Sequence, residues 1–386
     1  MKFKNRDRCV ITGSEDLEHL YTVKKLPVFI ACTTELQKND IKEDMEVYIS
    51  RSSGIIQLKK LLPLDVVYST YHSEAIGKVW EMHFQEFAKF IFKHNKVKKI
   101  IEVGGSNGRL ASICLKLDKE LNWTIIEPNP EKKEFNEKNI NVIPSFIEDK
   151  LDLISSDENT IVHSHTLEHL YEPSSFFESI SNRSKKGDVM IFSIPDLYNY
   201  LKKKFVNTIN FEHTFFITEA VADFLIKKSG YELVEKYYFN EHSIFYAIKF
   251  VGLDKIDINT LKFNKYTEYK KMYLDFISFI DAEVLRINKL INDYVVRNNN
   301  LKIYLFGAHI FSQFLINKGL QTNKIEAIID NSPNKVGKRL YGSNLKVINP
   351  EYLKGCGGLV ILKAGQYQAE VERQLNQISK KLKIVS

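Results

Sequence analysis

A glycine-rich turn between an apolar run and a helical pattern is the first candidate for chemistry in this sequence. It reads Ile-Ile-Glu-Val-Gly-Gly-Ser-Asn-Gly-Arg over residues 100–109, and a second apolar run ends at Glu127, nineteen residues past Gly108. Glycines such as Gly104 and Gly108 let the backbone approach a ligand, and the following helix offers its positive N-terminus. An acid at the end of the next strand bonds the two ribose hydroxyls of an adenosine-containing cofactor. The spacing therefore predicts such a cofactor, with Glu127 on its ribose.

Alternating strand and helix patterns surround this turn. Apolar runs predict strands at 99–103, 123–127, 141–143, 160–163 and 189–194, and helical patterns lie between them near 108–119, 130–138 and 173–182. Such alternation means parallel strands with crossover helices. A helix at 217–228 and two strands at 231–239 and 243–251 end the series in an antiparallel pair. This order is typical of the seven-stranded sheet of methyltransferases that use S-adenosylmethionine, and a nicotinamide cofactor is the competing ligand.

The flanking segments have patterns of their own. Short apolar runs split by polar turns before residue 74 indicate a small β-rich module, and a helical pattern follows at 74–94. A long helix is predicted at 266–297, followed by a second βαβ unit with strands at 301–306, 325–330 and 360–362 and a helix at 310–317. We therefore expect an α/β chain with three domains: a β-rich domain at 1–73, a doubly wound class I methyltransferase sheet at 74–251, and a long helix with a Rossmann-like α/β domain at 252–386.

Composition narrows the class of protein. The 386 residues are 27% charged and 44% apolar, with a net charge of +7 spread over lysines along the whole chain, so solvated faces are favoured over nucleic-acid binding. No apolar run is long enough to span a bilayer, and the N-terminus lacks the apolar core of a signal peptide. Four cysteines without a pairing pattern suggest a reducing compartment. We expect a cytoplasmic enzyme with no nucleic-acid or membrane partner, and its oligomeric state stays open.

Two histidine-bearing segments follow the fourth and fifth predicted strands. The first, residues 163–173, holds three histidines and Glu168, which raises the question of a metal; without an obvious third ligand for His163 and His165, we predict none. This loop covers the cofactor in doubly wound folds, so His165 is expected to line its site. The second segment, Asn-Phe-Glu-His at 210–213, lies on the ligand side of the sheet. His213 has the pKa range of a general base near neutrality, and Glu212 could orient or polarise.

Aromatic side chains before the helical pattern could contact the acceptor. Tyr68 and Tyr71 offer ring faces with hydroxyl tips that could stack on a sugar or nucleotide, whereas Trp80, at helical spacing, is better explained as core.

Taken in order, these features resemble the bacterial three-domain sugar methyltransferases that act on nucleotide-linked deoxysugars, whose best-known members are C-methyltransferases. The matching pieces are Ile-Glu-Val-Gly-Gly-Ser-Asn-Gly at 101–108, Ile-Glu-Pro at 126–128, Leu-Glu-His at 167–169 with Pro173, Thr-Ile-Asn-Phe-Glu-His at 208–213, Phe-Gly-Ala at 306–308 and Ile-Asp-Asn-Ser-Pro-Asn-Lys at 329–335. Together they cover nearly the whole chain.

The resemblance implies roles for further residues. Glu102 would hold the amino group of S-adenosylmethionine, and Gly105, Ser106, Pro128 and Leu167 would complete the cofactor site. His169 and Asn210 would contact the acceptor. In the C-terminal unit, the turn at Gly307 and His309, with Lys335, would bind the nucleotide-diphosphate end of the substrate. The products would be S-adenosylhomocysteine and a methylated nucleotide-linked sugar.

Two departures from that family matter. Its N-terminal domain usually holds zinc through two pairs of cysteines, whereas here Cys9 stands alone and Gly13, Arg51, Ser52 and Ser53 fill the other places, so we expect the domain without zinc. Its catalytic segment usually reads Tyr-His-Glu-His, and the tyrosine is replaced by Asn210. This replacement suggests a changed acceptor.

The expected activity is thus methyl transfer to a nucleotide-activated sugar or a related polysaccharide precursor, with His213 as the base. Three alternatives stay open: O-methylation of another nucleotide-activated small molecule, a nucleotide-sugar oxidoreductase, and a catalytically inactive scaffold. The oxidoreductase is disfavoured because Phe306-Gly-Ala-His lacks the spaced glycines of a nicotinamide site.

Overall fold

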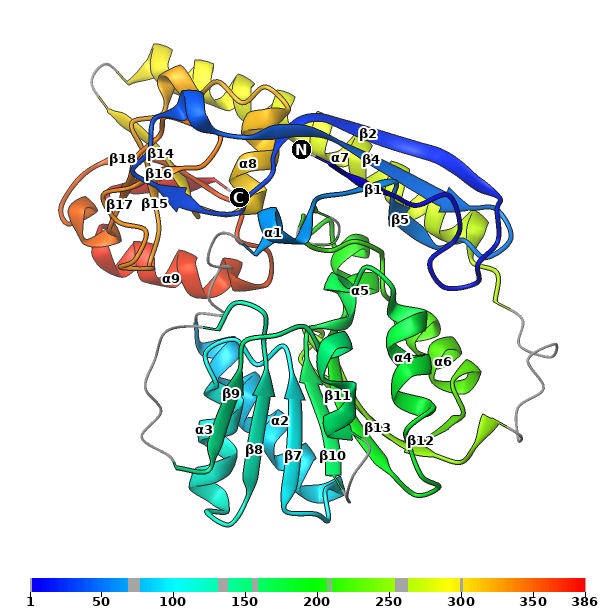
Figure 1. Cartoon of the computed structure of the whole chain (residues 1–386). Helices are drawn as coiled ribbons and strands as arrows, with labels where there is room; N and C mark the ends of the chain where they lie inside the picture. Colours follow the sequence, from blue (N-terminus) through cyan, green and yellow to red (C-terminus); the bar gives the residue numbers. More distant parts are fainter. Residues whose placement is uncertain are drawn as a thin grey trace.

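The computed structural model describes residues 2–68, 77–130, 138–154, 159–206, 208, 210–253, 263–298 and 301–385. Figure 1 shows a large sheet with helices on both sides, and above it a second body in which N-terminal strands, the long helix α7 and the C-terminal sheet lie together. The carboxyl ends of the parallel strands in the large sheet point toward this second body. No helix in the described ranges combines the length and apolar character that crossing a bilayer requires.

Seven strands in the described part of the chain form the large sheet. In the order β12-β13-β11-β10-β7-β8-β9 they are Tyr231–Phe239, Ser243–Phe250, Val189–Pro195, Asn159–Ser164, Lys99–Val103, Asn122–Ile126 and Ile140–Ile143. Strand β13 runs antiparallel to both of its neighbours, and the other pairings are parallel. The predicted mostly parallel α/β sheet ending in an antiparallel pair is confirmed. The helix expected near 130–138 falls mostly outside the described residues.

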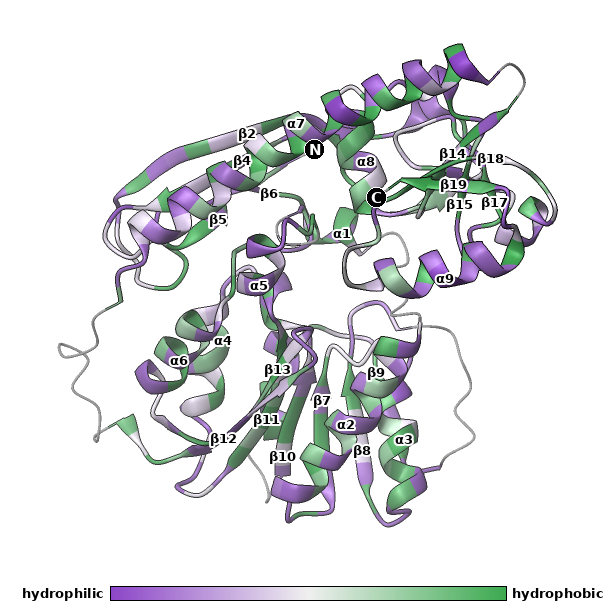
Figure 2. Ribbon diagram, turned by 180° about the vertical axis from the view of Figure 1, so that it is seen from behind, coloured by the Kyte–Doolittle hydropathy of each residue, from purple (hydrophilic) through white to green (hydrophobic). Residues whose placement is uncertain are grey.

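Both faces of this sheet are buried by amphipathic helices. Ile100 and Ile101 are neighbours in β7 but belong to different apolar clusters, as the twofold repeat of a strand requires. One cluster holds α2 (Lys78–His94) and α3 (Arg109–Leu117), and the other holds α4 (Pro173–Ser181), α5 (Leu197–Lys202) and α6 (Glu219–Lys228). Figure 2 shows α2 and α3 together in front of the sheet. The expected helix at 74–94 begins at Lys78 in the described chain.

The N-terminal segment forms two small antiparallel sheets. Strands β2 (Leu17–Pro27), β4 (Lys42–Ser50) and β5 (Ile56–Leu58) make one, β1 (Lys4–Asn5) and β6 (Lys60–Leu61) make the other, and the short helix α1 (Leu64–Val67) follows. The segment after His213 extends the first sheet: the Leu58 amide donates to the Thr214 carbonyl at 2.9 Å, and the Phe216 amide donates to the Ile56 carbonyl at 2.8 Å. The β-rich module therefore holds a loop of the large sheet.

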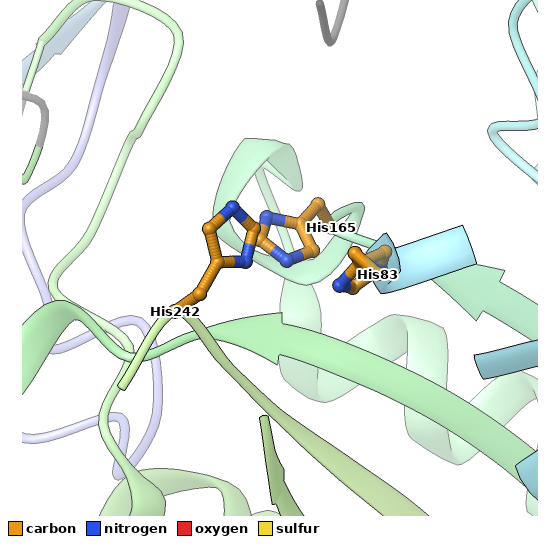
Figure 3. A group of neighbouring side chains, drawn as sticks. All are labelled: His83, His165 and His242. Atoms are coloured by element: carbon orange, nitrogen blue, oxygen red, sulfur yellow. The ribbon is translucent and has the colours of Figure 1, made fainter. Parts of the chain in front are cut away.

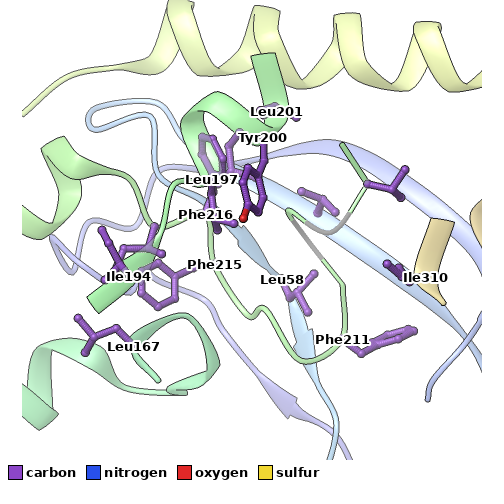
Figure 4. Close-up of a cluster of buried hydrophobic side chains, with 14 of the residues drawn as sticks. Leu58, Leu167, Ile194, Leu197, Tyr200, Leu201, Phe211, Phe215, Phe216 and Ile310 are labelled. Atoms are coloured by element: carbon purple, nitrogen blue, oxygen red, sulfur yellow. The ribbon is translucent and has the colours of Figure 1, made fainter. Parts of the chain in front are cut away.

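Apolar side chains reinforce this pairing. Phe215 and Phe216 are fully buried and share a cluster with Leu58 of β5 and Ile310 of the C-terminal unit, as Figure 4 shows. Burying each phenylalanine contributes about 1.5–3 kcal/mol.

The C-terminal unit contains a five-stranded parallel sheet and follows the long helix α7 (Tyr266–Arg297) in the chain. The bounds of α7 match the prediction. In the order β17-β15-β14-β18-β19 its strands are Val347–Ile348, Ala327–Ile329, Lys302–Phe306, Gly358–Leu362 and Leu382–Val385, and its helices are α8 (Ile310–Asn317) and α9 (Gln368–Ile378). Short 3-10 helices lie at Gln37–Asn39, Ile147–Ile154, Leu167–His169, Thr322–Lys324, Pro350–Leu353 and Gly365–Tyr367.

The two ends of the chain are joined by a small sheet and a buried ion pair. Strand β3 (Cys32–Thr33) pairs with β16 (Arg339–Leu340), and the Arg339 guanidinium makes two 2.7 Å bonds to the Asp40 carboxylate. The division of the chain at residues 73 and 251 remains a prediction.

In the family that this chain resembles, the loops of the N-terminal domain carry zinc ligands. Here hydroxyl groups and one carboxylate join these loops. The Asp16 carboxylate accepts bonds from the Ser14 and Ser50 hydroxyls at 2.8 Å and from the Ser52 amide. The Cys9 thiol lies 3.5 Å from the Ser53 hydroxyl.

Arg6, beside β1, ties the N-terminal module to two loops of the large sheet. Its buried guanidinium donates to the carbonyls of Thr214 (2.7 Å), Tyr171 (2.6 Å) and Leu170 (3.3 Å), and to the Thr214 hydroxyl. Burial lowers its pKa to about 10, so the group is still charged at neutral pH. One side chain thus fixes the loops after β10 and after β11.

We expect Arg6→Leu to lower the free energy of unfolding by about 2–3 kcal/mol, because buried carbonyls lose a charged donor. Urea unfolding followed by circular dichroism measures this change. Arg8→Ala, which removes an exposed cation two residues away, is the control and should change the value by no more than about 0.5 kcal/mol. Equal values for the two variants would contradict the role given to Arg6.

Glu102 is the buried acid of β7 and provides a second test. Its carboxylate accepts the Trp123 indole N–H at 2.7 Å and is 3% exposed. Burial raises its pKa to about 7, against the opposing effect of the Trp123 bond, with a smaller increase from the Glu127 charge.

The folded chain therefore holds the Glu102 proton more tightly than the unfolded chain, whose ordinary pKa is 4.5. Stability from this group is fully present below pH 4.5 and is lost as the pH rises through about 7, by an amount on the order of 3 kcal/mol. Glu102→Gln keeps an acceptor for Trp123 and stays neutral, so its stability relative to the wild type should grow between pH 5 and pH 8. Urea unfolding at both values measures this; parallel pH profiles would contradict the assignment.

Candidate functional site

A pocket of about 150 Å³ opens at the carboxyl ends of β7, β8 and β10. Its walls come from α1, the glycine turn, the end of β8 and the loops after β10 and β11. The lining residues are Val67, Tyr68, Gly104, Ser106, Glu127, Asn129, His165, Thr166, His169, Tyr171, Phe211 and Glu212.

The glycine turn forms one wall and has no room for side chains at two positions. Gly104 has φ +75°, and a Cβ built on it would lie 2.7 Å from the Thr166 hydroxyl. A Cβ on Gly105 would lie 2.6 Å from Ile125 and 2.9 Å from the Glu102 carboxyl carbon. Gly108, with φ +66°, precedes the first residue of α3. The backbone is thus exposed to the pocket at Gly104 and Ser106, as a close approach by a ligand requires.

Glu127 lines the pocket beside this turn. Its side chain is 7% exposed, and its oxygens accept the backbone amides of Ser106 (3.2 Å) and Asn129 (3.0 Å). A carboxylate has about four acceptor sites, so these two bonds leave capacity for ligand hydroxyls. The bare glycine backbone and this acid fit the ribose end of an adenosine-containing cofactor.

The loop after β10 is held in an unusual backbone conformation. His165 has φ +51°, and the Thr166 hydroxyl donates to the Val103 carbonyl at 3.1 Å. Glu168 is 1% exposed, and neither carboxylate oxygen has a hydrogen-bond partner among the described residues. Burial raises the pKa of Glu168 to about 8. Two imidazole nitrogens lie near its Oε1 atom, His165 Nδ1 at 3.6 Å and His169 Nε2 at 3.9 Å.

The loop after β11 brings His213 to His169. The two rings are 5.0 Å apart and nearly perpendicular, and Glu168, His169 and His213 each offer an atom within 4.8 Å of the others. His213 Nδ1 lies 3.3 Å from the Thr208 carbonyl. When Nδ1 donates to that carbonyl, the lone pair of the neutral ring is on Nε2.

Asn210 shapes this loop from within. Its amide oxygen accepts the backbone amides of Glu212 (2.8 Å) and His213 (2.9 Å), and the residue is 3% exposed. It does not line the pocket.

Seven of the predicted site residues line this pocket, and the others lie outside its lining. Tyr68, Gly104, Ser106, Glu127, His165, His169 and Glu212 line it, and His213 lies against His169. The predicted residues outside the lining are Glu102, Gly105, Gly108, Pro128, Leu167 and Asn210. Leu167 is fully buried in the apolar cluster. Tyr71 lies outside the described residues.

The three predicted residues of the C-terminal unit form a separate cluster. The His309 ring lies over Gly307, where a Cβ would meet it at 2.2 Å, and burial lowers the His309 pKa to about 4. The Lys335 ammonium contacts the Ala308 carbonyl at 3.1 Å and the Asp330 carboxylate at 3.3 Å. This turn repeats the arrangement of the first one, because the Asp330 carboxylate also accepts the Ala308 amide.

Sequence reasoning missed the contributions of Val67, Asn129, Thr166, Tyr171 and Phe211 to the lining. It also missed a group of three histidines, His83, His165 and His242, which come from α2, the loop after β10 and the turn before β13. Burial lowers the pKa of all three. Residues so far apart in the chain carry no shared spacing that could have revealed them.

Comparisons with known proteins concern the middle of the chain. The family model described as "Methyltransferase domain" matches residues 78–236. A search of curated proteins finds no match.

Among solved structures, the chain is similar to the N-methyltransferase NodS from Bradyrhizobium japonicum WM9, with 15% identity and a TM-score of 0.33 over 44% of this chain and 96% of that one. It is similar to the dimethyltransferase RosA from Streptomyces davawensis, with 11% identity and a TM-score of 0.38 over 45% of this chain and 55% of that one. The plantazolicin methyltransferase BpumL, solved with S-adenosylhomocysteine, has 11% identity and a TM-score of 0.34 over 45% of this chain and 84% of that one.

The family match covers the seven-stranded sheet up to β12, together with the glycine turn and Glu127. Residues 78–236 therefore match a methyltransferase domain, and methyl transfer is the enzymatic activity that this match supports.

Proposed function

We propose that the enzyme methylates a nucleotide-activated sugar and that His213 is its general base. The observation that carries this proposal is the shared pocket: Glu127 and Ser106 face it from one side, and Glu212 and the His169–His213 pair border it from the other. A methyl donor and an acceptor held by these two groups would be neighbours.

The cofactor would lie along the glycine turn. Gly104 and Ser106 offer backbone to it, and Glu127 would accept its ribose hydroxyls. When bound, S-adenosylmethionine supplies an electrophilic methyl group on a sulfonium. Glu102 is buried, bonds to Trp123 and does not line the pocket. It would therefore affect the cofactor's amino group only by a longer-range electrostatic interaction.

His213 would take the proton that the acceptor must lose. For a 4-keto sugar this is the proton on the carbon next to the carbonyl, and for a hydroxyl acceptor it is the hydroxyl proton. The Thr208 carbonyl favours the tautomer with the Nε2 lone pair, which is the form a base needs. Glu212 or a neighbouring donor would stabilise the charge that develops.

The loop after β11 differs from that of the resembling family at a position that would lie near the acceptor. Asn210 stands where the resembling family has a tyrosine, and its amide group builds the loop. Tyr68 and Tyr171, which line the pocket from two other elements, are the described phenols that could contact the sugar. The nucleotide end would lie at the C-terminal turn of Gly307 and His309, where Lys335 adds a positive charge.

We expect His213→Asn to reduce turnover roughly 10²–10⁴-fold, because proton transfer loses its base. The assay is methyl transfer from labelled S-adenosylmethionine to whichever nucleotide-linked sugar the wild type accepts in a screen. Affinity for S-adenosylhomocysteine should stay within about threefold.

His19→Asn, which changes an exposed histidine of β2, is the matched control and should leave turnover unchanged. Turnover of His213→Asn equal to that of the control would remove His213 from the role of base.

Glu127→Ala should weaken binding of S-adenosylhomocysteine about 10–100-fold, since two hydrogen bonds to a charged acceptor are lost. Calorimetric titration measures this, with Glu120→Ala as an exposed acidic control in the turn before β8. An unchanged dissociation constant in Glu127→Ala would show that the ribose binds elsewhere.

A further inference from the structure

Three histidine side chains from distant parts of the sequence converge beside the methyltransferase pocket. His83 lies on α2, His165 on the loop after β10, and His242 in the turn between β12 and β13, and Figure 3 shows the three rings gathered together. Each offers a ring nitrogen, and these nitrogens lie within 4.8 Å of one another. His83 and His242 are 0% and 1% exposed, and His165 lines the pocket.

All three rings point at one oxygen, the Ser243 hydroxyl. It lies 2.7 Å from His165 Nε2, 2.5 Å from His242 Nδ1 and 3.1 Å from His83 Nδ1. The three ring nitrogens thus surround this oxygen, and three imidazole nitrogens with one oxygen are the donor set of a four-coordinate site. An ion with bonds of about 2.0–2.1 Å would take the central place that the Ser243 hydroxyl holds, so the hydroxyl would move aside and the rings would move closer.

The surroundings of the cluster are those of a built site. The Trp80 ring packs edge-on against all three histidines, with ring centroids 4.6–5.1 Å away. Phe84, Phe239 and Phe245 contact the His83 ring. Such an apolar shell excludes water from metal ligands and fixes their orientation.

Glu168 provides an independent observation. Its buried carboxylate has no hydrogen-bond partner among the described residues, and it lies 3.6 Å from His165 Nδ1, on the opposite side of the ring from the nitrogen that faces the cluster. A carboxylate that takes the second N–H of a ligating histidine is the usual outer partner in metal sites.

We propose that His83, His165 and His242 bind a divalent transition ion of the zinc class, through Nδ1 of His83, Nε2 of His165 and Nδ1 of His242. The Ser243 hydroxyl or a water molecule completes the coordination, and Glu168 orients His165. Imidazole suits zinc and its neighbours rather than calcium or magnesium, which take oxygen ligands.

The ion would have a positioning role. His165 contributes to the pocket wall while its ring faces the cluster, and its backbone is held in the left-handed region. Metal binding would lock the loop after β10 onto α2 and the start of β13, and so fix the side of the pocket that carries His169. This inference stands apart from the proposed acceptor.

The competing arrangement is metal-free. One hydroxyl can donate to one ring and accept from two others, so Ser243 could satisfy all three histidines alone. The two arrangements differ in the effect of removing the hydroxyl: a metal site survives Ser243→Ala with water as the fourth ligand, whereas the hydrogen-bonded hub loses its centre.

Titration of the full-length, chelator-treated protein with Co²⁺, followed by visible absorption, tests the proposal. We expect one equivalent to bind with the intense bands of a four-coordinate site and Zn²⁺ to displace it. His242→Asn and His83→Gln should each weaken binding at least 100-fold, and Glu168→Gln about 10–100-fold. Ser243→Ala and the surface control His19→Asn should still bind. Absence of binding by the wild type would overturn the proposal.

The second group of possible ligands, Glu168, His169 and His213, needs its own control. His213→Asn should retain the Co²⁺ bands. Bands that vanish in His213→Asn but persist in His242→Asn would move the metal to the proposed catalytic histidines and overturn the assignment. If His242→Asn does not fold, His83→Gln decides: loss of the bands in a folded His83→Gln protein supports the assignment, and bands that persist in it overturn the assignment.

Discussion

The arrangement of the site depends on the backbone pairing between β5 and residues 214–216. Two hydrogen bonds, from the Leu58 amide to the Thr214 carbonyl and from the Phe216 amide to the Ile56 carbonyl, add the segment after His213 to the N-terminal sheet. Arg6 closes the same junction by bonding the Thr214, Leu170 and Tyr171 carbonyls. The loops that carry His169 and His213 are thereby attached to one partner, and they also bond to each other, because the Thr214 amide donates to the Glu168 carbonyl at 2.9 Å.

Buried acids give this edge of the sheet its electrostatic character. Glu102 and Glu168 lie below the pocket floor with raised pKa values, because burial disfavours their charged forms, while Glu127 is stabilised by two backbone amides at the wall. The glycine turn lets these groups approach each other, since any side chain at Gly105 would collide with Glu102. Two acidic side chains, Glu127 and Glu212, line the pocket, which suits a positively charged sulfonium donor.

Local patterns predicted the elements whose periodicity is strong. The parallel strands of the large sheet, the antiparallel β12–β13 pair and helix α7 follow from apolar repeats, and the turn with Glu127 follows from spacing. Long-range pairings could not be predicted in this way. The β3–β16 ladder joins residues about 300 positions apart. The Asn210 amide oxygen accepts the Glu212 amide only because the backbone turns at this point. His83 and His242 become neighbours only when α2 and β13 pack on the same sheet, so no sequence spacing links them.

The most direct test of the account is a calorimetric titration of the purified protein with S-adenosylhomocysteine, with NAD⁺ titrated in parallel. We expect micromolar binding of the first and none of the second, since we propose that Glu127 and the glycine turn hold the nucleoside of a methyl donor. Binding of NAD⁺ without S-adenosylhomocysteine would contradict it.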